Sequence, residues 1–440
     1  MGAMQHVEPA PAGGEEFRRG WKILIPSFVG GAFAMTTIAP IVIGSFVKPL
    51  GDDMEWSRIA VQAAQLFSQI LGTIGVIVTG ILLEKIGMRW AGIIGLAGTA
   101  LGLLLVSLSQ TLPYFYVTFA LTALVGSTAG AITWSRAITR EFDRHRGFAL
   151  ALTLSGSGLA LFILPSIMVR VIGDYGWRAA FVALACFPAL IALPAVLVLF
   201  KPREAAGPQA GDKQQDDLVG KAASRLKDIV GCYRFWALLL AVFCTYTAIT
   251  AIVTNFIPTL TDDGLSAETA AAAQGAIGAS MIISRLVIGF LLDRVWAPAV
   301  AALVAVPAAA GCLLLTMHPS WIGATIAAGL IGMAMGAELD LLAFLTSRYF
   351  KPAHFSRTYS YIYACAAVAG SIGPIAFASA QQITGTYDAG LYIAAGLFLL
   401  GGTTLLTLGR YRTNIGDAEY DDIDSISHFA PPGAADPILR

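Results

Sequence analysis

The sequence predicts an all-α integral membrane protein, with twelve transmembrane helices in two pseudo-symmetric six-helix bundles. Of its 440 residues, 56% are hydrophobic and 13% are charged, whereas a soluble globular chain carries about 25% charged residues. Apolar windows long enough to cross a hydrocarbon layer of about 30 Å recur from end to end. This composition excludes a secreted, nuclear or cytosolic enzyme, and a formal net charge of zero gives no reason to expect nucleic-acid binding.

The apolar windows predict helices, because lipid cannot satisfy free backbone groups and a barrel would need short strands of alternating polarity. The first window is too long for the core of a signal peptide, so we expect it to stay in the membrane as an anchor. The twelve predicted spans are 23–47, 60–83, 91–109, 113–139, 147–171, 179–200, 235–259, 268–292, 298–316, 321–347, 358–381 and 389–409.

One long charged segment separates the first six spans from the last six. Within it, Leu218, Ala222, Leu226 and Ile229 recur at helical spacing, which is typical of a short helix on the membrane surface, although a plain connector is the simpler interpretation. The predicted parts are a cytoplasmic tail over 1–22, six-helix bundles over 23–200 and 235–411, a cytoplasmic linker over 201–234 and a second cytoplasmic tail over 412–440.

The basic residues predict the orientation of the chain. With the N-terminus inside, 22 of the 28 Lys and Arg residues fall in cytoplasmic segments, and only Lys48, Arg58, Arg170 and Arg178 lie on the outer side. This asymmetry follows the positive-inside rule. We therefore expect a multi-pass protein of the cell inner (plasma) membrane with both termini in the cytoplasm.

The two halves repeat each other in sequence. Residues 80–85 end the second span as residues 289–294 end the eighth, 209 positions later. The pattern G-x-x-x-G-A at 126–131 in the fourth span returns at 332–337 in the tenth, 206 positions later. Two repeats at nearly one offset indicate an internal duplication, which is how many transporters are built.

The segment Gly80-x-Leu82-x-Glu84-Lys85-x-Gly87-x-Arg89, between spans 2 and 3, resembles a motif of the major facilitator superfamily. The resemblance implies two bundles around a central cavity, with acids and bases at facing helix ends that latch the cytoplasmic side in one state. The alternative is that these charges only mark the membrane boundary. The gating residues implied are Gly80, Glu84, Lys85, Arg89, Asp293 and Arg294.

Four charged residues lie within the predicted spans, where each costs roughly 2.5–3.5 kcal/mol on insertion. Arg285 is the best candidate for holding an anionic substrate, because its planar guanidinium binds a carboxylate through two parallel hydrogen bonds. The alternative for Arg285 is a permanent salt bridge to Glu338 or Asp340. Arg136 lies about one turn from the cytoplasmic end, so it either faces the cavity or snorkels to that end.

Glu338 and Asp340 are the candidates for proton coupling. They are two residues apart and point about 200° from each other on a helix, so only one of them faces a given ligand. Asp340 shares the smaller and more polar face, so we expect its face to form the cavity wall. An arriving anion that binds the arginine frees a nearby carboxylate to take up a proton. Binding of the anion and binding of the proton are thereby coupled.

Three uncharged side chains complete the predicted substrate site, namely Trp134, Tyr246 and Asn255, on spans that the resemblance places at the cavity. Trp134 suits stacking on an aromatic substrate, although membrane tyrosines and other aromatic residues are more often interfacial or packed. The five cysteines and five histidines show no metal-ligand spacing, so we expect neither a metal nor another cofactor.

Several short runs narrow the resemblance: Trp56-Ser57-Arg58, 146–149 (RGFA), 175–178 (YGWR), Arg285 and 348–350 (RYF). Together they resemble the monocarboxylate transporters and the oxalate/formate exchangers, which implies organic-anion transport, often with protons. Neither the lysine that animal monocarboxylate transporters carry in span 1 nor the lysine that oxalate exchangers carry in span 11 is present. Ala160-Leu161 also stands where proton-coupled drug exporters carry Gly-Pro, which disfavours drug export.

The sequence therefore predicts a secondary active transporter that takes up an organic anion with protons, with aromatic carboxylates among the candidates. Electroneutral anion exchange and, less favoured, proton-driven export are the alternatives within this class. A transporter-like sensor and an integral-membrane enzyme are the alternatives outside it, and no nucleophile–base pair or metal-ligand set supports an enzyme. The expected partners are the anion, protons and the lipid bilayer, with no nucleic acid, and the protein is expected to be a monomer.

Overall fold

The computed structural model describes residues 13–142, 145–202, 231–292, 294–350 and 352–409, and its regular elements are all helices. Within these ranges, ten helices are long and apolar enough to cross a membrane. Two of the ten, Arg58–Ser107 with 50 residues and Arg146–Leu199 with 54, each cover two predicted spans. The all-helical membrane fold is confirmed, whereas a count of twelve separate helices is not reproduced.

Two glycines divide the longest helical runs. Gly87 in α3 (Arg58–Ser107) has φ 77° and Gly176 in α7 (Gly156–Cys186) has φ 82°. Glycine adopts such a positive φ readily because it has no Cβ. Both glycines lie where the sequence predicts a loop between two spans, so the chain turns there without a longer connection.

The N-terminal half contains two more interruptions inside predicted spans. Span 23–47 is divided near Phe33 and Ala34, and span 113–139 is divided at Gly130, whose backbone is extended. The first helix begins at Gly13, ten residues before the predicted span and inside the predicted tail. The remaining elements of this half are α1 (Gly13–Ala32), α2 (Met35–Met54), α4 (Leu112–Gly126), η1 (Ser127–Ala129), α5 (Ala131–Glu141), α6 (Arg146–Leu154), η2 (Phe187–Ala192) and α8 (Leu193–Leu199).

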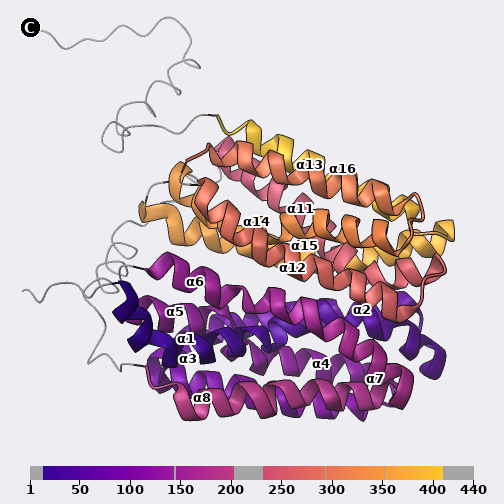
Figure 1. Cartoon of the computed structure of the whole chain (residues 1–440), viewed down its shortest axis with the longest axis horizontal. Coiled ribbons are helices and arrows are strands. Elements are labelled where there is room, and N and C mark those ends of the chain that lie inside the picture. The colour runs from indigo at the N-terminus through magenta and orange to yellow at the C-terminus, as the bar shows by residue number, and fades with distance from the viewer. Residues whose placement is uncertain (1–12, 143–144, 203–230, 293, 351, 410–440) are drawn as a thin grey trace, which may run out of the picture. The chain divides into compact units, whose positions relative to one another are not determined.

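In the C-terminal half, the described residues between 231 and 409 form six helices. In Figure 1 they form a pink-to-yellow group that lies beside the indigo-to-magenta helices of the first half. Most of the predicted linker 201–234 and the predicted tail 412–440 lie outside the described residues. The six helices are α11 (Tyr233–Asp262), α12 (Ala267–Leu292), α13 (Ala297–Leu315), α14 (Trp321–Tyr349), α15 (Pro352–Thr384) and α16 (Asp388–Leu406).

The two halves touch along three pairs of helices: α2 with α11, α3 with α15, and α7 with α12. Glycines bring the backbones close together in two of these pairs. A Cβ at Gly44 on α2 would overlap the carbonyl oxygen of Thr254 on α11, and a Cβ at Gly278 on α12 would overlap the carbonyl oxygen of Gly158 on α7. Small residues serve the same purpose in membrane helix pairs generally.

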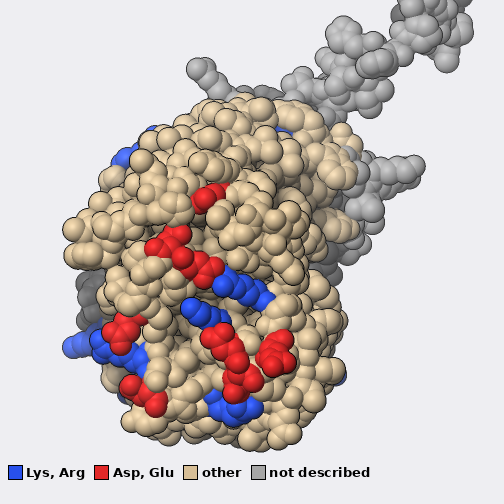
Figure 2. Space-filling view, turned by 90° about the vertical axis from the view of Figure 1, so that its right-hand side faces the viewer, with Lys and Arg blue, Asp and Glu red and all other residues tan. Residues whose placement is uncertain are grey.

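The two ends of the bundle differ in their charged residues. We call the end that carries Arg58, Asp262 and Asp388 the outer end, and the end that carries Glu84 and Arg294 the inner end, after the predicted orientation. Figure 2 looks onto the right-hand end of Figure 1, where α2 ends, and shows acidic and basic side chains close together among uncharged residues.

Candidate functional site: a cavity between the halves

A cavity of about 220 Å³ lies between the two halves and is bordered by helices of both. Its wall combines apolar residues with several polar side chains, and Arg285 and Glu338 are the charged residues in it. Its main polar side chains are Thr36, Gln69, Tyr246, Arg285, Glu338 and Tyr363. Arg285 and Tyr246, which the sequence predicts for substrate binding, thus line one space together with Glu338, which it predicts for proton coupling.

Arg285 is held on the cavity wall by the close packing of α12 against α14. Gly336 lies against α12, where a Cβ would come within 3.2 Å of the backbone nitrogen of Arg285. The neighbouring Ser284 hydroxyl donates a hydrogen bond of 2.7 Å to the carbonyl oxygen of Met333 on α14. The arginine side chain is only 3% exposed. The second G-x-x-x-G pattern thus positions a buried cation beside the helix that carries Glu338.

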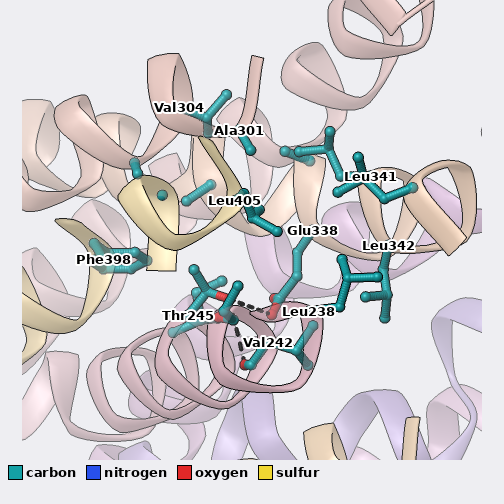
Figure 3. A pocket seen from close by; sticks show the side chains of 17 residues that line it. Leu238, Val242, Thr245, Ala301, Val304, Glu338, Leu341, Leu342, Phe398 and Leu405 are labelled. Carbon is teal, nitrogen blue, oxygen red and sulfur yellow. Dashed lines mark hydrogen bonds between the residues drawn. The ribbon is translucent and has the colours of Figure 1, made fainter. Parts of the chain in front are cut away.

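Glu338 borders two spaces at once. It lines the central cavity, and it also lines a smaller, apolar pocket inside the C-terminal half, which Figure 3 shows from close by. Its Oε1 lies 3.4 Å from Oγ1 of Thr245 on α11. The sequence predicts Glu338 and Asp340 as candidates and expects the face of Asp340 to form the cavity wall, and the structure places Glu338 on that wall. The side chain of Asp340 lies outside the described residues, so its role stays a prediction.

Trp134 packs in the core of the N-terminal half. Its side chain is fully buried, and its indole N–H donates a 2.6 Å hydrogen bond to the carbonyl oxygen of Ala129. The ring fills the space left by Gly30 and Gly92, where a Cβ would overlap or crowd it, and meets Phe200 edge-on. It also borders the cavity, so its role as a substrate contact stays a prediction.

Unlike Trp134, Arg136 and Asn255 are not among the residues that line the cavity. Arg136 is half-exposed on α5, which fits the snorkelling alternative. Asn255 is fully buried and exchanges two hydrogen bonds with Gln62 on α3, one of 2.6 Å from Gln62 Nε2 and one of 3.3 Å to its Oε1. Asn255 thus joins the two halves, and its assignment as a substrate contact is corrected to a contact between bundles.

A second contact between the halves lies at the outer end. The guanidinium of Arg58, at the start of α3, donates to both carboxylate oxygens of Asp262, at the end of α11, over 2.6 and 3.1 Å. It also donates a 2.8 Å hydrogen bond to the hydroxyl of Tyr387. We call Arg58, Gln62, Asn255, Asp262 and Tyr387 the outer clasp. Sequence reasoning missed it, although Arg58 stood out as one of the few bases on the predicted outer side.

The contacts that the structure gives for Arg89 and Arg294, two predicted gating residues at the inner end, lie within their own halves. Arg89 donates a 2.8 Å hydrogen bond to the carbonyl oxygen of Leu197, and the guanidinium of Arg294 lies 3.6 Å from the ring centre of Phe290. Glu84 and Lys85 are exposed, and Asp293 lies outside the described residues. A Cβ at Gly80 would meet nothing within 4 Å. The latch at this end therefore stays a prediction for another conformation.

Two helical halves around a cavity, joined at one end through side chains, define a membrane transport protein. Residues 24–374 match the Major Facilitator Superfamily, and the chain belongs to that family. Monocarboxylate transporter 13 of Bos taurus is 22% identical over 413 residues, covering 89% of this chain and 90% of its own length. An MFS transporter of Aspergillus flavus is 25% identical over 344 residues, covering 76% and 73%.

Solved structures show the same fold. A D-xylose–proton symporter superposes with a TM-score of 0.70 at 15% identity, covering 89% of this chain and 98% of that chain. A nucleoside transporter superposes with a TM-score of 0.69 at 13% identity, covering 89% and 99%. The family match and the monocarboxylate transporter relative confirm the sequence resemblance to the superfamily and to its monocarboxylate-transporter-like branch.

Proposed function

We propose that this protein takes up an organic anion, a carboxylate, together with a proton by alternating access. The observation that carries the proposal is the presence of Arg285 and Glu338 on the wall of one cavity between the halves. A guanidinium holds a carboxylate through two parallel hydrogen bonds and stays charged when it is buried. The similarity to monocarboxylate transporters supports the same class of substrate.

The two charged residues supply the coupling. A carboxylate entering the cavity is attracted by Arg285 and repelled by an ionised Glu338. Protonation of Glu338 removes the repulsion, so the anion and the proton are bound together more favourably than either alone. The outer clasp then closes one end of the cavity while the other end releases both. Tyr246 and Tyr363 contribute apolar surface and hydroxyl groups for the rest of the substrate.

Uptake into proteoliposomes tests this function. A thermal-shift screen of purified protein against aromatic and aliphatic mono- and diacids first supplies the substrate. Uptake of that acid should rise with an inward proton gradient and fall when the gradient is collapsed. Arg285→Gln should weaken transport by about a hundredfold, since two charge-assisted hydrogen bonds are worth about 3 kcal/mol, and Arg285→Lys should lose less.

Two outcomes contradict the proposal. Uptake that ignores the proton gradient but accelerates with counter-substrate on the far side identifies an anion exchanger instead. Transport that survives Arg285→Gln with an unchanged KM removes Arg285 from the substrate site. Unaltered thermal stability of the Arg285 variants is the control for folding.

A further inference from the structure

An apolar pocket lies beside the central cavity, inside the C-terminal half, and the transport proposal gives it no role. Figure 3 shows it from close by, among α11, α13, α14 and α16. Of the 17 residues that line it, only Thr245 and Glu338 carry polar side chains. Small residues leave the space open, namely Ala241, Ala301, Ala305, Ala334, Ala337 and Gly402.

The pocket adjoins the cavity on one side and is closed on the other. Ile249 on α11 and Glu338 on α14 belong to the walls of both spaces. The far wall comes from α13 and α16, and its residues Phe398 and Leu405 are buried. The shared wall indicates that a molecule bound in the cavity reaches the pocket past Ile249 and Glu338.

One turn of α14 places the pocket close to the predicted anion site. Gly336 packs against α12, where a Cβ would come within 3.2 Å of the backbone nitrogen of Arg285. The next residue, Ala337, lines the apolar pocket. A cation and an apolar hollow thus flank the same turn of one helix. An amphiphilic acid requires this pair of surroundings, because its carboxylate pairs with a guanidinium and its hydrocarbon chain fits a dry cavity.

We propose that the apolar pocket binds the hydrocarbon tail of the substrate, which is therefore an aliphatic carboxylate with a chain. The carboxylate binds Arg285 in the cavity, and the end of the chain enters the pocket past Glu338. The pocket has a volume of about 50 Å³, and a water-sized group takes about 10–15 Å³ of such space, so about three to five chain carbons fit. This inference rests on the proposed function, in which Arg285 supplies the site for the head group.

Competition by straight-chain acids tests the pocket. Proteoliposomes take up the acid found in the thermal-shift screen at constant pH, and the acids from propanoate to decanoate compete in turn. In the wild type we expect the inhibition constant to fall by about fourfold with each added methylene, over about three to five steps, and then to level off. Longer acids partition into the lipid equally for every variant, so the comparison between variants does not depend on partition.

Two substitutions change the size of the pocket in opposite directions. Ala301→Leu adds three carbon atoms to the wall, so the levelling should come about three carbons earlier and decanoate should bind roughly sixtyfold more weakly, with propanoate unchanged. Leu405→Ala removes three carbon atoms and should extend the rise in affinity to longer acids, which keeps the test available if Ala301→Leu does not fold.

Two control variants separate the tail from the head group. Ala310→Leu makes the same change as Ala301→Leu at an exposed position of α13 outside both walls, and should keep the wild-type series. Arg285→Gln should weaken acids of every length by the same factor, because it removes the partner of the carboxylate and leaves the pocket as it is.

Failure of this inference is distinguishable from failure of the transport function. If the wild type takes up no carboxylate, the proposed function itself is wrong. If carboxylates are taken up but their affinity ignores chain length, or if Ala301→Leu and Leu405→Ala both keep the wild-type series, the pocket does not hold the tail. If Ala301→Leu weakens propanoate as much as decanoate, the substitution acts on the head-group site and the inference is overturned.

Discussion

Two side chains that the sequence singles out for a ligand differ in how they are packed. Arg285 and Trp134 both border the cavity, but the ring of Trp134 also belongs to the hydrophobic core of its own half. Both residues lie within apolar spans and could bind a ligand. Their positions along the predicted spans do not show which of them packs in a core. The difference comes from Gly30 and Gly92, which leave room for an indole between two helices. A glycine on a distant helix cannot be paired with Trp134 from a single sequence.

Replacing Trp134 therefore tests stability more than recognition. We expect Trp134→Phe to destabilise the protein by about 1 to 3 kcal/mol, because the carbonyl oxygen of Ala129 loses its donor and part of the ring volume becomes empty. In detergent this should lower the melting temperature by a few degrees, while the KM for the substrate stays within about twofold.

Trp90 provides the matched control for this substitution. It is 60% exposed on α3, so Trp90→Phe should leave the melting temperature unchanged. A Trp134→Phe protein that melts like the wild type but binds aromatic acids much more weakly would support the stacking role. A change in melting temperature thus indicates a packing role for Trp134, and a change in the affinity for aromatic acids indicates a stacking role.

At the outer end, His318 brings the ends of neighbouring helices together. This residue has a left-handed backbone with φ 48° and lies between α13 and α14. Its Nδ1 is 2.8 Å from Oδ1 of Asp263, and its Nε2 is 3.9 Å from Oδ2 of Asp388. Asp263 directly follows Asp262, and Asp388 directly follows Tyr387. His318 therefore ties together the two turns that present the partners of Arg58.

The His318 cluster should make stability depend on pH. The hydrogen bond to Asp263, followed by its charge, raises the pKa of His318 above the ordinary value. A raised pKa in the folded state means that the contribution is complete below about pH 6.5, the ordinary histidine value, and is lost as the pH rises through the raised value. The wild type should therefore lose thermal stability over this window as the pH rises.

The variant His318→Asn isolates the contribution of the imidazole. Asparagine tolerates a left-handed backbone and does not titrate. The difference in melting temperature between wild type and variant should be largest at acid pH and should shrink above the window. A difference that stays constant from pH 5 to pH 9 would show that the ring acts by packing alone.

The sequence predicts where the helices lie better than it predicts where they are interrupted or which helix ends meet. Hydropathy predicted the helical runs well, because an apolar stretch in lipid has few alternatives to a helix. The interruption at Gly130 was not predicted, since a single glycine within an apolar run is compatible with a continuous helix. The outer clasp was missed for another reason. Arg58 and Asp262 are 204 positions apart, and no local pattern signals that one faces the other.

In the whole molecule, side-chain hydrogen bonds join the two halves toward the outer end, from Arg58 to Asp262 and between Gln62 and Asn255. The outer clasp and the backbone contact between Gly44 and Thr254 lie on the same side of the cavity. At the inner end, Gly80 and Gly289 occupy corresponding places in the two halves, and a Cβ at either would meet nothing within 4 Å. The internal duplication thus places a glycine at the same position in each half. Whether these glycines contact the other half depends on the conformation of the transporter.

The close backbone contact at Gly44 and the open space at Gly80 predict different effects of added bulk at the two ends. Gly44→Leu places a side chain against the backbone of α11, so the conformation with a closed outer end becomes less favourable. If the closed state is populated tenfold more than the open state, a penalty of about 2.7 kcal/mol on the closed state makes the open state the tenfold more populated one. Gly80→Leu meets free space in this conformation, so it should leave the outer end closed.

Distances between spin labels at Lys48 and Glu268 measure this shift. Both residues are exposed near the outer end, one in each half, and the labels are introduced in a cysteine-free background. We expect Gly44→Leu to add a population with a longer distance, Gly44→Ala to add a smaller one, and Gly80→Leu to keep the wild-type distribution. If Gly44→Leu leaves the distances unchanged while the protein remains folded, the contact between α2 and α11 does not govern closure. If Gly80→Leu opens the outer end as Gly44→Leu does, the two ends are not in opposition and the halves do not rock as rigid bodies.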